Sequence, residues 1–315
     1  MRSPVAAIIG AGSIAPFHVD ALRRAGFDVA HVAASLGSKR AARFGAEHRI
    51  ARIWDDPLEL IRASDWDLIV LAASTEANGQ LLKTVIETRK LCLVEKPISV
   101  AAKDVAGYKD HSLIRVSYNR RFYASVQKAR AFVREGPCLV RLELPEMLPE
   151  GTGLRAVSEH SVHGFDLLNY LFPGLRLAST DKFESIPGGR TAILRSARGD
   201  VCVVILNWNC PANFALVMDR APRRLELRPF EQATLYEGMD VIQPTVEASV
   251  RQYVPRIFET VSSFPGPGMC KPGFLEQAQE LRSILRGKPP LISAGLQDAY
   301  RASALAEALI AVGTE

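Results

Sequence analysis

The sequence has no apolar run that approaches the roughly 20 residues of a membrane-spanning helix, and its five cysteines include no CxxC spacing. The apolar run at residues 5–9 is shorter than the roughly 7–15 residues of a signal-peptide core and leads directly into glycines. We therefore expect a cytoplasmic protein with reduced core thiols, and neither a disulfide framework nor a cysteine zinc site.

Charge of one sign is not concentrated anywhere along the chain. Lysine and arginine total 39 against 34 acidic residues, a net charge of +5, and the tight basic groups are short, as at residues 220–228. A nucleic-acid-binding protein usually gathers basic residues on one face, so we expect no nucleic-acid partner. Mild positive charge suits an anionic substrate or cofactor.

The first part of the chain alternates between short apolar runs and segments with helical spacing. A length of 315 residues predicts about two domains. Strands alternating with helices at this spacing indicate βαβ units and a parallel sheet. We predict a Rossmann-type doubly wound dinucleotide-binding domain over residues 1–120. Its expected strands lie at 5–9, 28–34, 67–72, 91–94 and 113–118.

The pattern changes to many short extended segments separated by turn residues, typical of an antiparallel sheet. We predict an α+β domain over residues 121–315, with a large, mostly antiparallel open sheet that serves substrate binding and oligomerisation. A helix is expected at 156–171, and the last helix, at 297–311, is expected to pack back on the first domain.

A glycine-rich loop connects the first expected strand to the first expected helix. Gly10 permits the tight turn, and Gly12, which has no side chain, lets a pyrophosphate approach the backbone. Ala15 allows close packing of the helix on the strand, and the helix N-terminus offers N–H groups to phosphate. We expect Gly10, Gly12, Ser13, Ile14 and Ala15 to bind a dinucleotide.

The end of the second expected strand lacks the carboxylate that selects NAD about 20 residues beyond the glycines. It carries Ser35, Ser38, Lys39 and Arg40 instead. Hydroxyl groups and cations suit a 2′-phosphate, so we expect NAD(P) with NADP favoured over NAD. The alternative is that Lys39 and Arg40 lie on the solvated face of the following helix.

Lys96 follows the strand at 91–94 and so lies at the carboxyl end of the sheet, where such folds bind ligands. A lysine there can donate to a substrate hydroxyl and stabilise a developing alkoxide, and burial would lower its pKa. The alternative is a surface lysine near a turn.

A third cluster contains Glu159, His160, His163 and Asp166. On one continuous helix, Glu159, His163 and Asp166 fall at i, i+4 and i+7 and form one stripe. His163 can accept a proton near neutral pH, with Glu159 or Asp166 orienting it. A solvated helix face is one alternative. Another is a zinc hydrolase built on His160 and His163, but without a further ligand set we expect no metal.

Together these motifs resemble the Gfo/Idh/MocA oxidoreductases, a family that includes glucose–fructose oxidoreductase and inositol dehydrogenase. The likeness extends over essentially the whole chain. The similar segments are the glycine loop at 7–15, the EKP segment at 94–98, the YNxRF-like segment at 117–122, the helix at 159–166 and the closing helices at 273–275 and 296–299.

The resemblance implies hydride transfer between nicotinamide and a carbinol carbon of a sugar, sugar derivative or cyclitol. Lys96 would touch both substrate and nicotinamide, and His163 would be the catalytic acid/base. Glu159 stands where the family usually has aspartate. Because members of this family often associate through the second-domain sheet, the resemblance also implies a homodimer or homotetramer.

Further cofactor and substrate contacts follow from the same resemblance, with departures. Ser74 and Asn78 replace a common proline and histidine beside the cofactor, and the substrate-bordering segment at 144–159 is short and proline-rich. Arg121 and Arg155 are candidates for an anionic substrate group or, alternatively, structural ion-pair partners. The expected cofactor contacts add Ala73, Ser74, Asn78, Glu95 and Lys96, and the expected substrate contacts are Lys96, Asn119, Arg121, Arg155, His160 and His163.

A protein of another class remains the alternative, namely a non-catalytic dinucleotide-binding sensor or regulator of the same fold. The substitution of the usual aspartate by Glu159 favours this alternative, whereas the presence of both Lys96 and His163 argues against it.

Overall fold

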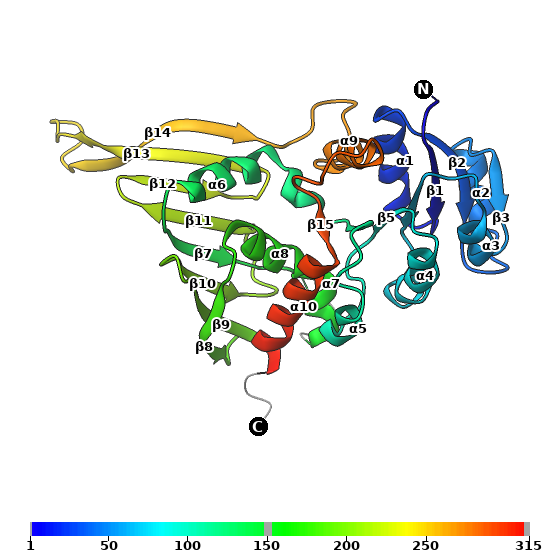
Figure 1. Ribbon diagram of the computed structural model, residues 1–315. Helices are drawn as coiled ribbons and strands as arrows, with labels where there is room; N and C mark the ends of the chain where they lie inside the picture. Colours follow the sequence, from blue (N-terminus) through cyan, green and yellow to red (C-terminus); the bar gives the residue numbers. More distant parts are fainter. Residues whose placement is uncertain (1, 148–152, 312–315) are drawn as a thin grey trace. The chain divides into compact units, whose positions relative to one another are not determined.

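The structure, a computed structural model, describes residues 2–147 and 153–311 (Figure 1). It divides into two compact units. The first comprises residues up to Phe122 together with Val157–Asp166 and Pro265–Glu307, and the second comprises Tyr123–Ala156, Leu167–Phe264 and the residues from Ala308. The two later segments of the first unit were predicted for the second domain. Separate cofactor and substrate domains stay a prediction.

The first unit is built on a seven-stranded sheet in the order β15-β6-β5-β4-β1-β2-β3. Every pairing in it is parallel except that of β15 with β6. β4 and β5 are buried at every position, as expected for strands covered on both faces. The predicted Rossmann-type sheet is confirmed. Its strands are β1 (Val5–Ile9), β2 (Asp28–Ala33), β3 (Arg52–Trp54), β4 (Leu68–Leu71), β5 (Leu91–Val94), β6 (Ile114–Val116) and β15 (Ala294–Gly295).

Helices of the first unit supply the apolar side chains that cover this sheet. Leu22, Phe274 and Leu281 join Ile8 and Leu68 in one buried cluster. The helices are α1 (Ala15–Arg24), α2 (Arg40–Glu47), α3 (Pro57–Arg62), α4 (Thr75–Glu87), α5 (Ala102–Ala106), the 3₁₀ turn η1 (Asn119–Phe122), α9 (Phe274–Leu285) and α10 (Leu296–Ala311), whose last residues belong to the second unit.

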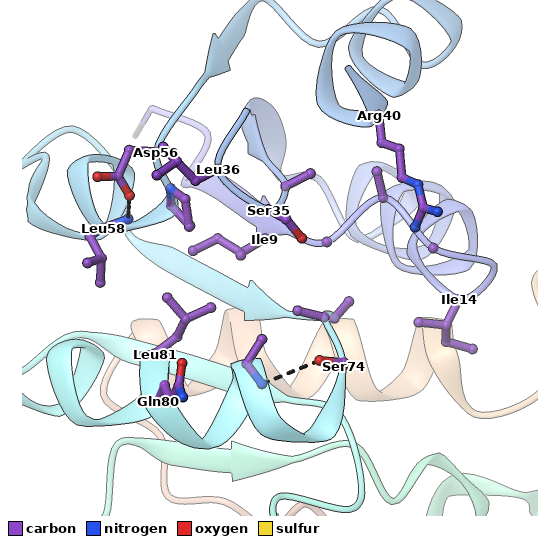
Figure 2. Close-up of a pocket in the computed structure, with 18 of the residues that line it drawn as sticks. Ile9, Ile14, Ser35, Leu36, Arg40, Asp56, Leu58, Ser74, Gln80 and Leu81 are labelled. Atoms are coloured by element: carbon purple, nitrogen blue, oxygen red, sulfur yellow. Dashed lines mark hydrogen bonds between the residues drawn. The ribbon is translucent and has the colours of Figure 1, made fainter. Parts of the chain in front are cut away.

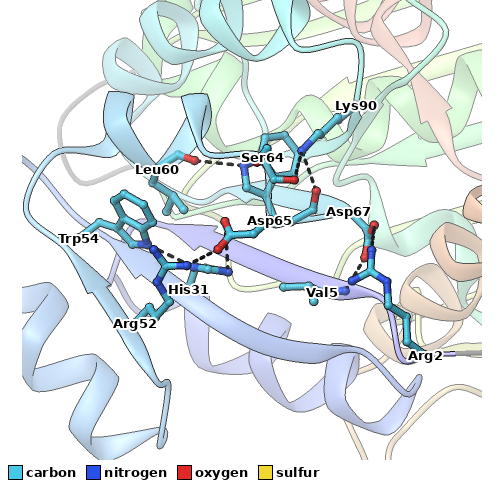
Figure 3. Close-up of polar contacts among 11 residues, drawn as sticks. Arg2, Val5, His31, Arg52, Trp54, Leu60, Ser64, Asp65, Asp67 and Lys90 are labelled. Atoms are coloured by element: carbon cyan, nitrogen blue, oxygen red, sulfur yellow. Dashed lines mark hydrogen bonds and ion pairs between the residues drawn. The ribbon is translucent and has the colours of Figure 1, made fainter.

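Polar contacts tie β2 and β3 to the loop before β4 (Figure 3). The Trp54 indole donates to Nδ1 of His31 over 3.2 Å, and Asp65 pairs with both Arg52 and His31. Because His31 is buried, its pKa is lowered. These contacts join neighbouring parts of the sheet and have a structural role.

The second unit contains an eight-stranded sheet in the order β14-β13-β12-β11-β7-β10-β9-β8. Its one parallel pairing joins β7 and β10, so the mostly antiparallel sheet is confirmed. The strands are β7 (Leu139–Glu143), β8 (Arg176–Phe183), β9 (Gly189–Arg195), β10 (Val201–Leu206), β11 (Ala215–Arg220), β12 (Arg223–Leu227), β13 (Gln232–Ile242) and β14 (Gln252–Ser262), with α6 (Ala124–Arg134) beside them.

The predicted continuous helix at 156–171 is wrong. The chain forms α7 (Leu154–His160) and α8 (Val162–Leu171), separated at Ser161. The Gly164 N–H donates to the carbonyl of Ser161, three residues back, which tightens the chain between the two helices. Across the described ranges, no helix is long and apolar enough to cross a membrane.

Candidate dinucleotide and catalytic site

The glycine loop begins directly after β1. Gly10 has a φ of +114°, and a Cβ there would lie 2.2 Å from the carbonyl oxygen of Ala72. Only glycine fits this position. At Gly12, by contrast, a Cβ would meet no heavy atom of the described residues within 4 Å. Packing within the protein therefore does not require this second glycine, and the backbone there is left open to a ligand.

The N-terminus of α1 follows the loop and has the features of an anion site. Ile14 stands at the N-cap, and no side chain in the described parts of the chain caps the helix. The positive end of the α1 dipole points into this region, although the Ala15 and Phe17 N–H groups donate to the Gly12 and Ile14 carbonyls over 3.2 Å and Pro16 has no N–H. A phosphate group suits this position.

A pocket of about 800 Å³ opens between the carboxyl ends of β1, β2 and β4 (Figure 2). Its volume lies within the usual range for small-molecule sites of roughly 300–1,000 Å³. Open α/β sheets bind ligands at this end of their strands. The open backbone at Gly12, the uncapped helix and the pocket volume together fit a dinucleotide.

Eight of the expected cofactor residues line this pocket, and six do not. Ser35 and Arg40 both face it, from the end of β2 and the start of α2 (Figure 2). The residues that line it are Gly10, Gly12, Ser13, Ile14, Ser35, Arg40, Ala73 and Ser74, and those outside its lining are Ala15, Ser38, Lys39, Asn78, Glu95 and Lys96.

Two of the residues outside the lining hydrogen-bond to the main chain of residues that line the pocket. The buried Asn78 side chain accepts from the Ala73 N–H over 3.1 Å and donates to the Ala73 carbonyl over 3.2 Å. The Ser38 hydroxyl accepts from the Arg40 N–H over 3.2 Å. Asn78 and Ser38 therefore shape the loops that carry pocket residues.

The sequence reasoning missed a wall of the pocket that α3 and α4 provide. Ala77, Gln80, Leu81 and Thr84 follow helical spacing along one face of α4, and this spacing was the available signal. Asp56 lines the pocket from the start of α3, where its carboxylate accepts the Leu58 N–H over 2.7 Å.

His18, a residue of α1, was also not predicted to belong to the site. Its Nε2 lies 2.6 Å from Oε1 of Glu95, and both side chains are largely buried. Burial raises the pKa of Glu95, but the hydrogen bond and charge of His18, with the Ser117 hydroxyl and the charge of Lys96, together lower this pKa below its ordinary value. The ionised carboxylate only accepts hydrogen bonds, so His18 Nε2 is the donor.

The Lys96 side chain contacts one member of the Glu159, His160, His163 and Asp166 cluster, namely the main chain of Glu159. Its Nζ donates to the Glu159 carbonyl oxygen at the end of α7 over 2.8 Å. An ammonium group has three N–H donors, and this bond orients the group. Lys96, Glu159 and His163 all belong to the first unit.

His163 lies at the start of α8 and is held neutral. Burial, together with the positive charges of Lys96, Arg120 and Lys271, places its pKa well below the ordinary value. Its buried Nδ1 makes no hydrogen bond within the described residues. The Tyr118 ring packs edge-on at 5.9 Å between centroids. A neutral imidazole in this setting can accept a proton.

The predicted stripe of Glu159, His163 and Asp166 is wrong, because the helix breaks at Ser161. The buried carboxylate of Asp166 instead accepts three hydrogen bonds of 2.5–3.1 Å from Arg121. Asp298 lies a further 3.3 Å from the same guanidinium. This geometry corresponds to the ion-pair alternative for Arg121 and not to an anion-binding side chain.

The other expected substrate residues are dispersed. Asn119 is buried and donates to the Pro272 carbonyl over 3.0 Å. His160 and Arg155 are exposed on α7. Part of the proline-rich segment at 144–159 lies outside the described residues. Within residues 2–147 and 153–311, no group of three His, Cys, Asp or Glu side chains is placed to hold a metal ion.

Comparison with known proteins agrees with this geometry. Residues 5–117 match the family model GFO_IDH_MocA, described as "Oxidoreductase family, NAD-binding Rossmann fold". The match covers the first part of the chain, which is similar to that family over these residues. The resemblance deduced from the glycine loop and the EKP segment is confirmed.

Curated relatives match over part of their length. An uncharacterized oxidoreductase, YrbE, of Bacillus subtilis is 26% identical over 53% of each chain. An inositol 2-dehydrogenase of Paracoccus denitrificans is 28% identical over 51% of this chain and 53% of its own. The match thus spans about half the length of these curated relatives.

Solved structures share the fold over almost the entire chain. A levoglucosan dehydrogenase in complex with NADH and L-sorbose superposes with a TM-score of 0.78 at 14% identity, covering 99% of this chain and 96% of its own. A myo-inositol dehydrogenase from Lactobacillus casei, in complex with NAD(H) and myo-inositol, gives 0.74 at 16% identity, covering 99% and 96%. At these identities the likeness establishes the fold.

Proposed function

We propose that this protein is an NAD(P)-dependent oxidoreductase that transfers a hydride between nicotinamide and a CH–OH carbon of a sugar, sugar derivative or cyclitol. The observation that carries the proposal is the partly buried His163, whose buried Nδ1 is unpaired within the described residues and whose pKa is lowered by desolvation and by the charge of Lys96. Both residues belong to the same unit as the open glycine loop. Relatives named as inositol and levoglucosan dehydrogenases support the substrate class.

The two side chains have complementary roles in this proposal. During oxidation, His163 accepts the proton of the substrate hydroxyl, because its imidazole is neutral at physiological pH. Lys96 donates a hydrogen bond to the same oxygen and stabilises the negative charge that develops on it. The Glu159 carbonyl orients the Lys96 ammonium. The bound dinucleotide would supply the hydride acceptor, and the proton transfer and the hydride transfer both reverse during reduction.

We further propose NADP as the preferred dinucleotide. Ser35 and Arg40 line the pocket beyond β2, where an NAD-selecting carboxylate is missing. A guanidinium forms charge-assisted hydrogen bonds with phosphate. The carboxylate of Asp56 in the same pocket is engaged in capping α3.

The second unit is proposed to join copies of this chain into a homodimer or homotetramer. Its edge strand β14 and the neighbouring strand β13 expose large apolar side chains, including Ile242, Tyr253, Ile257 and Phe258. Clustered exposed apolar surface is typical of an interface. Light scattering of an Ile257→Asp, Phe258→Asp variant checks this proposal, which predicts a smaller particle than the wild type forms.

A panel of sugars and cyclitols, tested with NAD and NADP, examines the catalytic proposal. We expect reduced nicotinamide to form with the wild type and kcat to fall by about 10²-fold or more in Lys96→Ala and His163→Ala. Glu159→Gln should retain most of the activity, since it keeps the main-chain carbonyl that holds Lys96. Unchanged kcat in both alanine variants, with dinucleotide binding intact, would overturn the assignment.

The non-catalytic sensor remains the rival function. Its distinguishing result is tight dinucleotide binding without turnover of any polyol in the panel, in either direction. Binding is measured from the fluorescence of the reduced dinucleotide, so the two functions separate without knowledge of the natural substrate.

A further inference from the structure

A buried hydrogen bond joins the helix that opens the dinucleotide site to the segment that carries Lys96. His18 lies on α1, the helix whose N-terminus follows the glycine loop, and its Nε2 donates to Oε1 of Glu95 over 2.6 Å. The side chains of His18 and Glu95 are 3% and 12% exposed. Water therefore competes little for this bond, and an unpaired carboxylate at this position would carry a large desolvation penalty.

The His18 ring is fixed from a second direction. The Phe274 ring, at the start of α9, packs against it with 4.9 Å between centroids. The imidazole is thereby confined between an apolar ring and a carboxylate. Two contacts of different kinds leave it little freedom to change rotamer.

Glu95 connects the fixed His18 ring to the main chain of Lys96. Its second carboxylate oxygen, Oε2, lies 3.3 Å from the Lys96 N–H. Besides His18, the groups that favour its ionised form are the Ser117 hydroxyl and the Lys96 charge. One carboxylate thus accepts a bond from His18 through Oε1 and lies against the Lys96 backbone through Oε2, just before the side chain reaches the Glu159 carbonyl.

We propose that His18 is a positioning residue for Lys96, acting through Glu95. By this chain of contacts, the helix that borders the dinucleotide phosphates also sets the direction of the lysine ammonium. The inference rests on the proposed function, because Lys96 has a catalytic role only there. It assigns a role to a histidine outside the glycine, EKP and His163 motifs.

Four variants separate positioning from simple support of the fold. His18→Leu removes the donor, while His18→Gln places an amide nitrogen at about the place of Nε2. His18→Asn carries the same amide on a side chain too short to reach Glu95. Phe274→Leu removes the packing against His18 and leaves the hydrogen bond, so it separates the effect of the apolar contact from that of the bond.

The first measurement uses hydride transfer and dinucleotide affinity. In His18→Leu we expect kcat to fall about 10²-fold, the order of loss for a reacting group displaced by about 1 Å, with the dinucleotide Kd unchanged. His18→Gln should restore most of kcat, and His18→Asn should not. Since the effect acts through Glu95, adding Glu95→Gln to His18→Leu should cause little further loss.

The second measurement needs no substrate. Trace acetylation followed by mass spectrometry reports the reactivity of Lys96 relative to the exposed Lys83 on α4. We expect His18→Leu and His18→Asn to raise the relative labelling of Lys96 severalfold, Phe274→Leu to raise it less than either, and His18→Gln to leave it near the wild-type value.

The outcomes distinguish this inference from the proposed function. If the wild type turns over no polyol but Lys96 labelling responds as expected, the coupling holds and the proposed function fails. If folded His18→Asn leaves both kcat and Lys96 labelling at wild-type values, His18 does not position Lys96. If His18→Leu does not fold, the comparison of His18→Gln with His18→Asn decides by the same criteria.

Discussion

The guanidinium of Arg121 is held by the carboxylate of Asp166 in three hydrogen bonds, and both side chains are buried. Arg121 belongs to η1 and Asp166 to α8, so the pair ties the turn after β6 to the helix that contains His163. We expect the pair to stabilise the start of α8 and so to help position His163, and a substrate contact by Arg121 stays a prediction.

Replacement of Arg121 by leucine is expected to lower the free energy of unfolding by about 3–5 kcal/mol, because it leaves Asp166 buried without its partner. Urea denaturation measures this loss. Arg24→Leu, which breaks an exposed pair with Asp20 on α1, is the matched control and should cost much less. A stable Arg121→Leu protein with only a raised substrate KM would instead restore the substrate-binding role.

The two loop glycines are expected to behave differently when each is replaced by alanine. Gly10→Ala should lower the free energy of unfolding by about 3 kcal/mol or more, since its Cβ would overlap the Ala72 carbonyl at a positive φ. Gly12→Ala meets no described atom and should stay within about 0.5 kcal/mol of the wild type.

For dinucleotide affinity we expect the larger effect from the other variant, Gly12→Ala, which should fold normally. Gly12→Ala places a methyl group where the pyrophosphate approaches the backbone, so we expect its Kd to rise about tenfold or more. Thermal unfolding with and without dinucleotide measures both effects. If Gly12→Ala binds the dinucleotide as tightly as the wild type, the assignment of this loop as the phosphate site is wrong.

The Rossmann part of the fold was predictable because its signals are local. Each buried strand is a short apolar run, and Gly10 and Gly12 follow the first strand at the spacing that the phosphate loop requires. The family resemblance rested on the same local segments. The strand ends could be placed to within a few residues for this reason.

The contacts that complete the candidate site were not predictable in the same way. His18 and Glu95 lie 77 residues apart, and Arg121 and Asp166 lie 45 apart. No local pattern specifies either pair, since each depends on how helices pack against the sheet. The break at Ser161 was missed because residues 156–171 contain no proline and keep a helical apolar spacing on both sides of it.

His163 gives the protein a defined response to acid. Its folded-state pKa lies well below the value of about 6.5 for an unfolded histidine, so the unfolded chain binds protons first as pH falls. Stability is therefore lost as pH falls through about 6.5 and continues to fall toward the folded-state pKa. His163→Gln should show a smaller loss between about pH 7.5 and pH 5.5.

Urea midpoints across this pH range test the response in both proteins. His31→Gln serves as the comparison, because burial also lowers the pKa of His31, which does not line the pocket. Both variants should reduce the acid loss, and only His163→Gln should also abolish hydride transfer. An identical pH dependence in wild type and His163→Gln contradicts a neutral His163.

Arg40 and Lys39 provide a direct test of the preference for NADP. They are adjacent in the sequence, but Arg40 lines the pocket and Lys39 does not. A charge-assisted hydrogen bond contributes about 1.5–3 kcal/mol, so Arg40→Ala should weaken NADP binding by about 10–100-fold. Its effect on NAD, which lacks the 2′-phosphate, should be small.

Lys39→Ala removes one positive charge next to the same loop, and we expect it to leave both affinities nearly unchanged. Calorimetric titration of the three proteins with NADP and NAD therefore separates a specific contact from the general positive charge of the region. If Arg40→Ala weakens both dinucleotides equally, the guanidinium contacts a part that they share. A wild-type preference for NAD would overturn the assignment of NADP, because the absence of a carboxylate after β2 would then carry no selectivity.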